Sequence, residues 1–514
     1  MINKNEGLIQ NQSTGFHAFS LGLLTILLRV PFTSKILYHW DSVNFAFSIT
    51  EFSIAKEQPH PPGYILYVYL IRLLNTFINN PNSSMVVVSI VSSGLAVACL
   101  YLLALRLFGR KVAFISGIFL ITSPLYWFYG EIALPHALDA ALAILCAYLL
   151  FEAQKNVRYG YWAIVVLAVT GGFRPQTLVF LMPLAAFSLA RWKGRNIIFW
   201  LLLGFGVCLA WFMPMINLNG GLQQYLTVFN QFSARFQTST SVLSGAGWGG
   251  LTRNGIKLAI YTLYSLGFSA FGVIGFLTNP ASRTRSEINK YVFLIVWILP
   301  AFLYYFLVHM GQQGLVFIFL PALLMILAAG LQYIYELSNK IGIAFFLTIA
   351  ILNSAIFLSL PEYPFGRIDG QRFLTRQTID NNDRFFIERI ESVNKRLSNK
   401  FPIIVAENWR HVQFYLPDTQ IIGFEPVQKW EANSGELILK EGQEFKSLDW
   451  LSDESKNRKN LEIIFFDLPV ENVIMNDLPG QSFSKESDEG IEILSIKGPV
   501  QFSLNGNWVY VRPK

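Results

Sequence analysis

Cysteine and charged side chains are both scarce in this sequence. Only three of the 514 residues are cysteines, and all three lie inside apolar runs: Cys99, Cys146 and Cys208. We expect them to be small buried residues, which argues against a disulfide framework or a cysteine-ligated metal site. Charged residues make up 14% of the chain and hydrophobic residues 53%. This balance is typical of a membrane protein rather than of several soluble domains.

The scarce charges are unevenly distributed. Up to about residue 360 the chain is a series of apolar runs of about 15 to 24 residues, the length that the hydrocarbon core of a bilayer requires. After that point charged residues become frequent. The sequence therefore predicts a polytopic α-helical membrane domain, 1–360, followed by a soluble domain, 361–514.

About eleven transmembrane helices are predicted by length and hydropathy. In chain order they cover residues 17–37, 85–108, 112–128, 136–152, 160–172, 176–190, 196–216, 255–277, 291–308, 315–336 and 341–360. The first run is interrupted by Arg29 and Pro31 and lacks a small-residue cleavage site. We therefore expect a retained span rather than a cleaved signal peptide.

The segment 62–78 is apolar but short, and it carries Arg72 and Asn75 near its middle. If it were a span, the basic loops at 109–111 and 191–195 would both lie outside, against the positive-inside rule. We therefore predict an interfacial helix within an outer loop, 38–84. The N-terminus is then cytoplasmic, and the soluble domain lies on the outer side of the plasma membrane. The net charge of +7 arises largely from inner loops and does not indicate nucleic acid binding.

Two further regions lie outside the predicted spans. The loop 217–255 contains no Asp or Glu but carries Arg235, Trp248 and Arg253, and it suits either a lid, a contact with anionic lipid, or a plain polar tether. In the soluble domain the pattern predicts a strand at 401–406, a helix at 407–415, and strands at 420–424, 461–466, 491–496 and 508–511. A small α/β or α+β domain without a nucleotide-binding loop is expected.

The first candidate for catalysis is Asp41, just after the first span. It either serves as a general base or caps the amphipathic helix predicted for 42–55, and both roles can hold together. Glu51, in the same helix, is expected to be a solvated surface charge. His60 is held by the following prolines, Pro61 and Pro62, and is either a phosphate or metal ligand or a simple interfacial histidine.

A second acidic group surrounds the start of the span at 136. Pro135 suits the first turn of a helix, so His136 and Asp139 share one face. A carboxylate at the centre of a span costs on the order of 3 kcal/mol, which makes Asp139 a functional candidate, whereas near the end of the span it marks only an interfacial helix start. Glu131, in the loop, is the stronger candidate for a metal or acceptor site.

Two outer turns supply groups for an anion. Arg174 lies where 171–176 interrupts two short spans, and its planar guanidinium suits a lipid phosphate, the alternative being an ordinary snorkelling arginine. The hairpin 309–314 offers His309 and Gln312 for phosphate or sugar contacts. A metal held by Glu131, His60 and His309 is conceivable, but no tight ligand spacing supports it.

Taken in order, several motifs resemble the GT-C superfamily of glycosyltransferases. They are an acid in the first outer loop, HPPGY at 60–64, YGE at 129–131, GGFRP at 171–175, and a His-x-Gly-Gln-x-Gly hairpin at 309–314. The residues are most similar to the protein O-mannosyltransferase and aminoarabinose-transferase-like branch, which uses polyprenyl-phosphate sugars, and the resemblance covers about residues 16–360.

The resemblance implies an inverting transfer of a monosaccharide from a polyprenyl-phosphate carrier to a protein, lipid or glycan acceptor on the outer face. Asp41 matches the family's catalytic acid of the first loop, and Glu131 or Asp139 falls at its second acidic motif. His136, Asp139 and Trp248 become candidates for acceptor or sugar contacts, and Arg174, His309, Gln312 and His60 for the donor phosphate. Ser42 replaces an acidic neighbour found in some branches, and His60 replaces a charged pair, so the donor sugar and a divalent metal cofactor stay open.

Two other classes of function compete with a transferase. A polyprenyl-lipid flippase or transporter needs polar groups through the centres of its spans or a detectable internal repeat. The conspicuous polar groups here gather instead on one face of the membrane, and no repeat is evident. A non-catalytic scaffold that presents the soluble domain would leave Asp41, Arg174 and His309 unexplained.

Overall fold

The computed structural model describes residues 4–192, 194–279, 285–364, 372–397, 403–427, 436–439, 461–467, 483–496, 500–504 and 507–511. The chain divides into two compact units. Residues 1–35 and 44–380 form the first, here called the helical unit; residues 36–43 and 381–514 form the second, here called the C-terminal unit. The short segment 36–43, which precedes most of helix α2, therefore belongs with the end of the chain.

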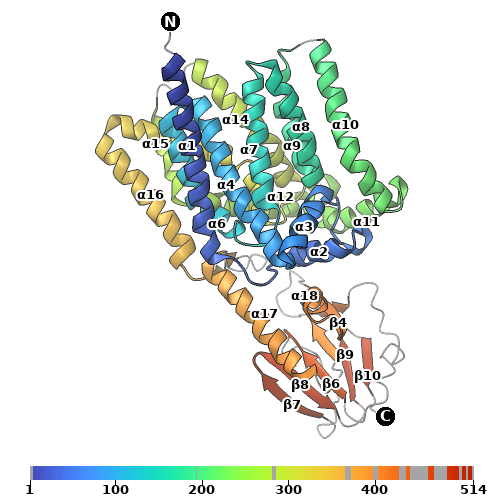
Figure 1. Cartoon of the computed structure of the whole chain (residues 1–514). Helices are drawn as coiled ribbons and strands as arrows, with labels where there is room; N and C mark the ends of the chain where they lie inside the picture. Colours follow the sequence, from blue (N-terminus) through green and yellow to red (C-terminus); the bar gives the residue numbers. More distant parts are fainter. Residues whose placement is uncertain are drawn as a thin grey trace. The chain divides into compact units, whose positions relative to one another are not determined.

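The helical unit is a bundle of apolar helices (Figure 1). In chain order the long helices are α1 Lys4–Arg29, α4 Pro81–Phe108, α5 Arg110–Thr122, α7 His136–Ala153, α8 Val157–Phe173, α9 Pro175–Leu189, α10 Arg195–Leu218, α12 Gly247–Leu266, α14 Arg285–Leu307, α15 Leu320–Leu337 and α16 Asn339–Ser359. Shorter pieces are α6 Pro124–Tyr129, α13 Gly272–Thr278 and the 3-10 helices Val30–Phe32, Ile54–Lys56, Val242–Ser244, Gly267–Phe271 and Gln313–Ile318.

Within the described residues, eight helical segments are long and apolar enough to cross a membrane. The other three predicted spans correspond to shorter helices, α5, α8 and α9. The predicted polytopic architecture is thus confirmed. The break predicted at 171–176 is also present, because α8 ends at Phe173 and α9 begins at Pro175, which leaves Arg174 between them.

Small residues allow the helices to approach closely. A Cβ atom on Gly94 of α4 would lie 2.7 Å from the carbonyl oxygen of Gly22 in α1, and a Cβ on Gly22 would lie 3.0 Å from that of Gly94. Contacts between backbones at this distance replace the hydrophobic driving force that is missing between helices in lipid.

Three helices gather at the end of the bundle away from the N-terminus (Figure 1): α2 Trp40–Thr50, α3 Ile65–Ile78 and α11 Leu222–Thr240. Helix α3 has 14 residues, about 21 Å of length, which is shorter than the hydrocarbon core. Arg72 of α3 donates two hydrogen bonds, of 3.1 and 2.6 Å, to the carbonyl oxygen of Ser48 in α2. The loop between the first two long spans is thereby folded into packed helices.

The prediction of a loop at 217–255 was wrong, because most of that segment is helical. Leu222, Tyr225, Leu226 and Phe229 recur at the spacing of one helical face and give α11 an apolar side despite its polar composition. Arg235 of α11 pairs with Glu57 at 2.7 Å, and the Tyr225 hydroxyl donates to the carbonyl oxygen of Pro62 at 3.0 Å.

The C-terminal unit is an α/β domain, as predicted. Its six-stranded sheet has the order β5-β4-β3-β6-β8-β7, in which β3 runs parallel to both β4 and β6 and the other pairs are antiparallel. The strands are β3 Ile403–Ala406, β4 Gln420–Val427, β5 Glu436–Leu439, β6 Leu461–Phe465, β7 Phe483–Asp488 and β8 Ile491–Ile496. Two-stranded sheets pair β1 Tyr363–Pro364 with β2 Arg372–Phe373, and β9 Val500–Leu504 with β10 Asn507–Val511.

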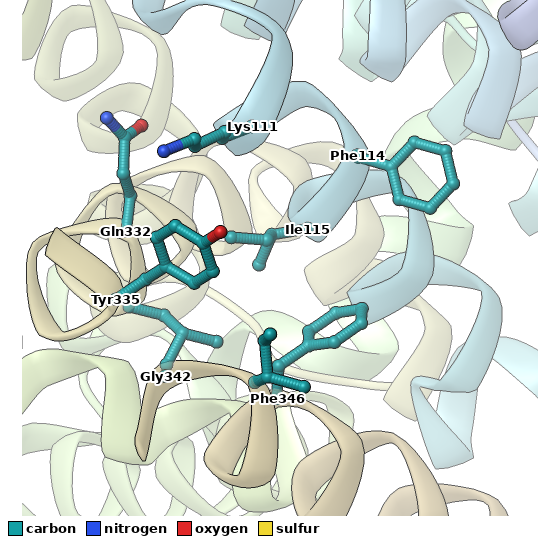
Figure 2. A pocket seen from close by; sticks show the side chains of 9 residues that line it. Lys111, Phe114, Ile115, Gln332, Tyr335, Gly342 and Phe346 are labelled. Atoms are coloured by element: carbon teal, nitrogen blue, oxygen red, sulfur yellow. The ribbon is translucent and has the colours of Figure 1, made fainter. Parts of the chain in front are cut away.

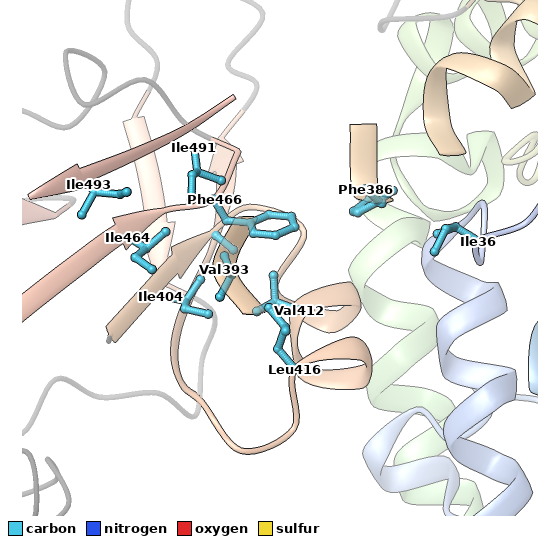
Figure 3. Packing of buried hydrophobic residues seen from close by; sticks show 11 residues of the cluster. Ile36, Phe386, Val393, Ile404, Val412, Leu416, Ile464, Phe466, Ile491 and Ile493 are labelled. Carbon is cyan, nitrogen blue, oxygen red and sulfur yellow. The ribbon is translucent and has the colours of Figure 1, made fainter. Parts of the chain in front are cut away.

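Helices α17 Arg376–Leu397 and α18 Trp409–Tyr415 contribute the rest of the core of this unit. Figure 3 shows apolar side chains of α17, α18 and the sheet packed together, with Ile36 among the members of the cluster. Helix α17 was not predicted. Its many charges obscured a buried stripe made by Ile379, Phe386 and Val393 at intervals of seven residues.

Labelling of single cysteines tests the predicted orientation. In a variant with the three native cysteines replaced by Ser, Glu51→Cys and Lys340→Cys each place a thiol on an exposed position at opposite ends of the bundle. We expect a membrane-impermeant maleimide to label Glu51→Cys in intact cells, and Lys340→Cys only after permeabilisation. Labelling in the reverse pattern would contradict the orientation and would place the candidate site on the cytoplasmic side.

Candidate functional site

Buried polar side chains meet at the end of the bundle opposite the N-terminus. They come from the start of α7, the break between α8 and α9, and the hairpin that joins α14 to the 3-10 helix Gln313–Ile318. Four residues predicted as site candidates lie together here: His136, Asp139, Arg174 and Gln312.

The centre of this cluster is an ion pair between Arg174 and Asp139. Arg174 Nη1 lies 3.1 Å from Asp139 Oδ2, and each side chain is only 6% exposed. The hydroxyl of Thr177, in the first turn of α9, donates to the other carboxylate oxygen, Oδ1. Removing one partner of a buried pair leaves an uncompensated charge and typically costs about 3 to 5 kcal/mol. Asp139 therefore holds Arg174 in place and is not free to act as a base.

His136 links this ion pair to the hairpin. Its Nε2 lies 2.7 Å from Gln312 Oε1, and its Nδ1 lies 3.3 Å from Arg174 Nη1. The guanidinium can only donate, so Nδ1 accepts and the proton of a neutral imidazole sits on Nε2, where it is donated to the amide oxygen. Arg174 therefore donates both to Asp139 and to His136, and His136 donates in turn to Gln312.

The hairpin approaches His136 because it carries glycine at position 314. A Cβ atom there would lie 2.6 Å from Cγ of His136 and 2.8 Å from Cε1 of Tyr129. The ring of Tyr129 in turn stands perpendicular to that of His136, with centroids 5.0 Å apart. The His-x-Gly-Gln-x-Gly motif is thus explained by packing as well as by its polar groups.

The same hairpin carries His309 into a positively charged neighbourhood. His309 Nδ1 lies 3.1 Å from the Thr240 hydroxyl. Burial, with smaller contributions from the charges of Arg253 and Lys257, lowers the pKa of His309 to about 4. The imidazole is therefore neutral at physiological pH, and the potential around it is positive. Arg253 and Lys257 stand four residues apart on α12, so they share one face of that helix.

Lys257 was not among the sequence predictions. It is buried in α12, within the predicted span 255–277, and an intramembrane lysine is a functional candidate by default. That signal was available in the sequence. It was missed because the segment was assigned as a span by its mean hydropathy, which a single cation hardly changes.

The guanidinium of Arg174 has a further donor at Nε. Within the described part of the chain its Nε is buried and makes no hydrogen bond. A buried N–H without a partner costs free energy until an acceptor reaches it. An oxyanion is the acceptor that matches this geometry and charge.

Glu131 is completely buried, at 0% exposure. Trp127 donates from Nε1 to its Oε1 at 2.7 Å, while Oε2 has no hydrogen-bond partner among the described residues. Burial raises the pKa of this carboxyl well above its ordinary value, and the charge of Arg29 opposes the rise. The backbone carbonyl of Glu131 accepts from the N–H of Ser34 at 3.0 Å, which fixes the loop after the first span.

Asp41 lies in the C-terminal unit, and its side chain is 19% exposed. It is the second residue of α2 and therefore not the N-cap that was one predicted role. Its backbone N–H donates to Nδ1 of His39 at 3.0 Å, so this nitrogen accepts and carries no proton. The 3.6 Å approach of Asp41 Oδ2 to the same nitrogen is then not an ion pair. Of the three candidate acids, Asp41 has the most accessible side chain.

His60 lies apart from the ion pair, in the turn before α3. Its Nε2 lies 3.3 Å from the Tyr64 hydroxyl, and its ring packs against Phe45 and Phe232. Tyr64 is within electrostatic range of Arg174, so the HPPGY turn borders the buried cluster through its tyrosine.

Two other predicted positions lie on the surface. Trp248 is 83% exposed and makes no contact with the cluster that the structure describes. Glu51 is exposed and pairs with Lys56 at 2.7 Å, which confirms its prediction as a surface charge.

The structure does not bring the metal candidates together. Among the described residues, no group of three or more His, Cys, Asp or Glu side chains is placed to hold a metal ion. Glu131, His60 and His309 each have the separate surroundings described above.

One apolar cavity lies at the other end of the bundle (Figure 2). It has a volume of about 210 Å³ and is lined by the start of α5, the end of α15 and the start of α16. The ammonium group of Lys111 stands 4.4 Å from the ring centroid of Tyr335 there. Because the polar cluster lies where α15 begins and this cavity where α15 ends, the cavity is no part of the candidate site.

Comparison with known proteins gives one family match and several similar structures. The family model described as dolichyl-phosphate-mannose-protein mannosyltransferase matches residues 59–217, a range that contains His60, Glu131, His136, Asp139 and Arg174. No match to a curated protein sequence was found.

Among solved structures, ArnT from Cupriavidus metallidurans in the apo state has a TM-score of 0.55 at 11% identity, covering 96% of this chain and 98% of that one. The same protein bound to undecaprenyl phosphate also has a TM-score of 0.55 at 11% identity, covering 93% and 97%. The Archaeoglobus fulgidus oligosaccharyltransferase has a TM-score of 0.47 at 13% identity, covering 81% and 65%. The fold is therefore shared with ArnT over nearly the whole of both chains.

The buried ion pair predicts a large loss of stability for a single substitution. Asp139→Asn removes the charge that compensates Arg174, and we expect the free energy of unfolding to fall by about 3 kcal/mol. The double variant with Arg174→Gln removes both charges and should recover part of the loss. Thermal unfolding in detergent measures this, with the exposed Glu51→Gln as control. Equal stability of Asp139→Asn and wild type would contradict the pairing.

The lowered pKa of His309 predicts a dependence on acidity. A histidine whose folded pKa of about 4 lies below its unfolded value of 6.5 binds more protons when unfolded. Its contribution to stability is complete above pH 6.5 and is lost as the pH falls towards 4, by up to about 1.4 kcal/mol per pH unit. Thermal midpoints of His309→Gln should therefore decline less between these pH values than those of wild type.

Proposed function

We propose that this chain is a membrane glycosyltransferase of the GT-C superfamily and that it transfers a monosaccharide from a polyprenyl-phosphate carrier to an acceptor, which the family match and the shared fold support. The reaction takes place on the outer face of the membrane and inverts the anomeric carbon. ArnT, whose fold is shared, has been solved with undecaprenyl phosphate bound, which supports a carrier of this class. The acceptor is a protein, lipid or glycan with a nucleophilic group that can lose a proton.

The observation that carries the proposal is the ordered set of buried donors at one end of the bundle. When the glycosidic bond to the carrier breaks, the departing group is a phosphate anion. Preorganised donors and cations stabilise such charge most strongly where water is excluded. Arg174 offers its Nε, and the hairpin places His309 in the positive field of Arg253 and Lys257.

The surroundings of these residues indicate a different role for each of them. Asp139 neutralises Arg174 and orients it, so Asp139 and His136 act on the donor side through the arginine rather than as direct acceptor contacts. The region of His309, where two cations set the potential, is the better place for the phosphate charge itself. Gln312 joins the two groups through His136.

Asp41 serves as the general base. Its carboxylate takes the proton of the acceptor group while the acceptor atom attacks the anomeric carbon on the side opposite the phosphate. The bond between that carbon and the phosphate oxygen breaks, and its electron pair leaves with the phosphate. A single displacement of this kind inverts the stereochemistry. Glu131, which is fully buried, supports the loop and takes no part in the proton transfer.

The position of the polar cluster favours a transferase over a transporter. His136, Arg174 and His309 lie at one end of the bundle, whereas a path for a lipid head group needs polar side chains along the spans. A scaffold role would leave a buried ion pair and an intramembrane lysine without a purpose.

Asp41→Asn tests the assignment of the base. General base catalysis contributes typically 10²- to 10⁴-fold, so we expect transfer from a polyprenyl-phosphate sugar to fall at least about 100-fold while donor binding is retained. Glu51→Gln, at the exposed position that directly follows α2, is the matched control and should keep wild-type activity. Wild-type turnover in Asp41→Asn would contradict the assignment of Asp41 as the general base.

The donor itself is open to direct identification. Lipid-linked sugars extracted from a strain that lacks this protein should contain an accumulated polyprenyl-phosphate monosaccharide, detectable by mass spectrometry. Its disappearance on expression of wild-type protein, but not of Asp41→Asn, connects the lipid to this site.

A further inference from the structure

The segment 36–43 is the most unusual feature of the domain division. It follows the first span and includes the first four residues of α2, yet it belongs to the C-terminal unit. Its first residues are not helical or extended in a sheet, so their backbone groups need partners from elsewhere.

Side chains of α17 and α18 supply those partners. The N–H of Ile36 donates to Asp383 Oδ1 at 3.2 Å, and the N–H of Leu37 donates to the Tyr415 hydroxyl at 3.0 Å. The carbonyl oxygen of Leu37 lies 3.0 Å from Nε2 of His411. Three backbone groups of two neighbouring residues are thus held by three buried or partly buried side chains.

The side chain of His411 is itself fixed by packing. The imidazole of His411 stacks on Phe386, with ring centroids 4.4 Å apart and an interplanar angle of 13°. Burial lowers the pKa of His411 to about 3, so the ring is neutral and donates its Nε2 proton to Leu37. Burial likewise raises the pKa of Tyr415 to about 12, which keeps its hydroxyl protonated.

Apolar contacts hold the same segment on either side of these bonds. Ile36 is part of the hydrophobic core of the C-terminal unit (Figure 3). Trp40 meets Trp409 edge to face, with centroids 5.2 Å apart and an angle of 82°. Asp41 follows Trp40 directly, in the first turn of α2. The backbone that leads to Asp41 is therefore anchored immediately before it and again four residues earlier.

The remainder of α2 is held by the helical unit. Phe45, one turn after Asp41, packs against Tyr64 and Tyr67 with ring centroids 5.3 and 4.9 Å apart. A single helix of 11 residues thus has its beginning fixed by one unit and its continuation by the other.

We propose that the C-terminal unit positions the catalytic base, with Tyr415, His411 and Asp383 as positioning residues that hold the segment leading to Asp41. The inference rests on the proposed function, in which Asp41 takes the acceptor proton. Fixing one residue of a flexible segment costs about 1 to 2 kcal/mol, and prior ordering removes that cost from the reaction barrier. The C-terminal unit is on this view a required part of the transferase rather than an appendage.

Two substitutions in the full-length protein test whether Tyr415 and His411 keep segment 36–43 ordered. Tyr415→Phe removes a single oxygen atom, and His411→Leu removes the donor to Leu37. Hydrogen exchange of the peptide that contains 36–43 should become at least about 10-fold faster in each variant, because an amide without its partner opens more often. His411→Gln offers an N–H in place of Nε2 and should restore slow exchange. Gln413→Ala, on the exposed side of α18, is the matched control.

Turnover tests the consequence for catalysis. Misplacement of a reacting group by about 1 Å can cost 10²-fold, so we expect kcat of Tyr415→Phe and His411→Leu to fall about 10- to 100-fold with KM for the lipid-linked donor unchanged. His411→Gln should recover most of the loss. Thermal midpoints measured on the same samples separate this effect from unfolding, and Tyr415→Phe, the smallest change, remains informative if His411→Leu is unstable.

The outcomes separate this inference from the proposed function. If hydrogen exchange of segment 36–43 is unchanged in Tyr415→Phe, the side chain does not hold the segment in place. If exchange is faster but kcat is unchanged, the ordering of the segment does not contribute to catalysis. Activity retained in Asp41→Asn would instead reject the base itself, whatever the exchange experiment shows.

Discussion

A charge buried among apolar helices must be compensated, and the ion pair between Arg174 and Asp139 is the interaction on which the candidate site depends. Each side chain comes from a different part of the bundle: Asp139 from the first turn of α7 and Arg174 from the break between α8 and α9. Neither could be buried alone without a cost of several kcal/mol. Pairing therefore locks the relative position of three helices and at the same time aims a guanidinium at one end of the bundle.

The same constraint explains why the neighbouring groups are arranged as they are. His136 bonds to Arg174 through its lone pair and to Gln312 through its proton, so the direction of every hydrogen bond follows from the fixed charge of the guanidinium. The hairpin can reach His136 only because Gly314 leaves room for its ring. Once the hairpin is in place, His309 lies near Arg253 and Lys257. The positive potential around His309, which suits a phosphate, therefore depends on a hairpin that the Arg174–Asp139 ion pair holds in place through His136.

The three acids of the family motifs acquire different chemistry from their surroundings. Asp139 is paired, Glu131 is buried with a raised pKa, and Asp41 retains an accessible carboxylate. Proton transfer from an acceptor requires the last of these environments. Asp41 also lies at a junction: α2 begins in the C-terminal unit and continues in the helical unit. This placement is the basis of the role that we propose for the C-terminal unit.

Much of the architecture follows from local signals in the sequence. Spans are set by the length of apolar runs, and the strands of the C-terminal unit by alternation and β-branched residues, because both signals are local. The amphipathic helices α11 and α17 were missed because their polar or charged composition hid apolar residues that recur on one helical face. The motifs also identified His136, Asp139, Arg174 and Gln312 as candidates.

Only the tertiary structure decided what those candidates do. Arg174 and its partner Asp139 are 35 residues apart in the chain, and His136 and its partner Gln312 are 176 residues apart. No periodic pattern in a sequence predicts contacts over such separations. The burial of Glu131 and the contacts between Leu37 and α18 likewise depend on how distant segments pack. A sequence shows which groups can carry charge or donate a hydrogen bond. Their surroundings, which fix pKa, accessibility and partner, exist only after folding.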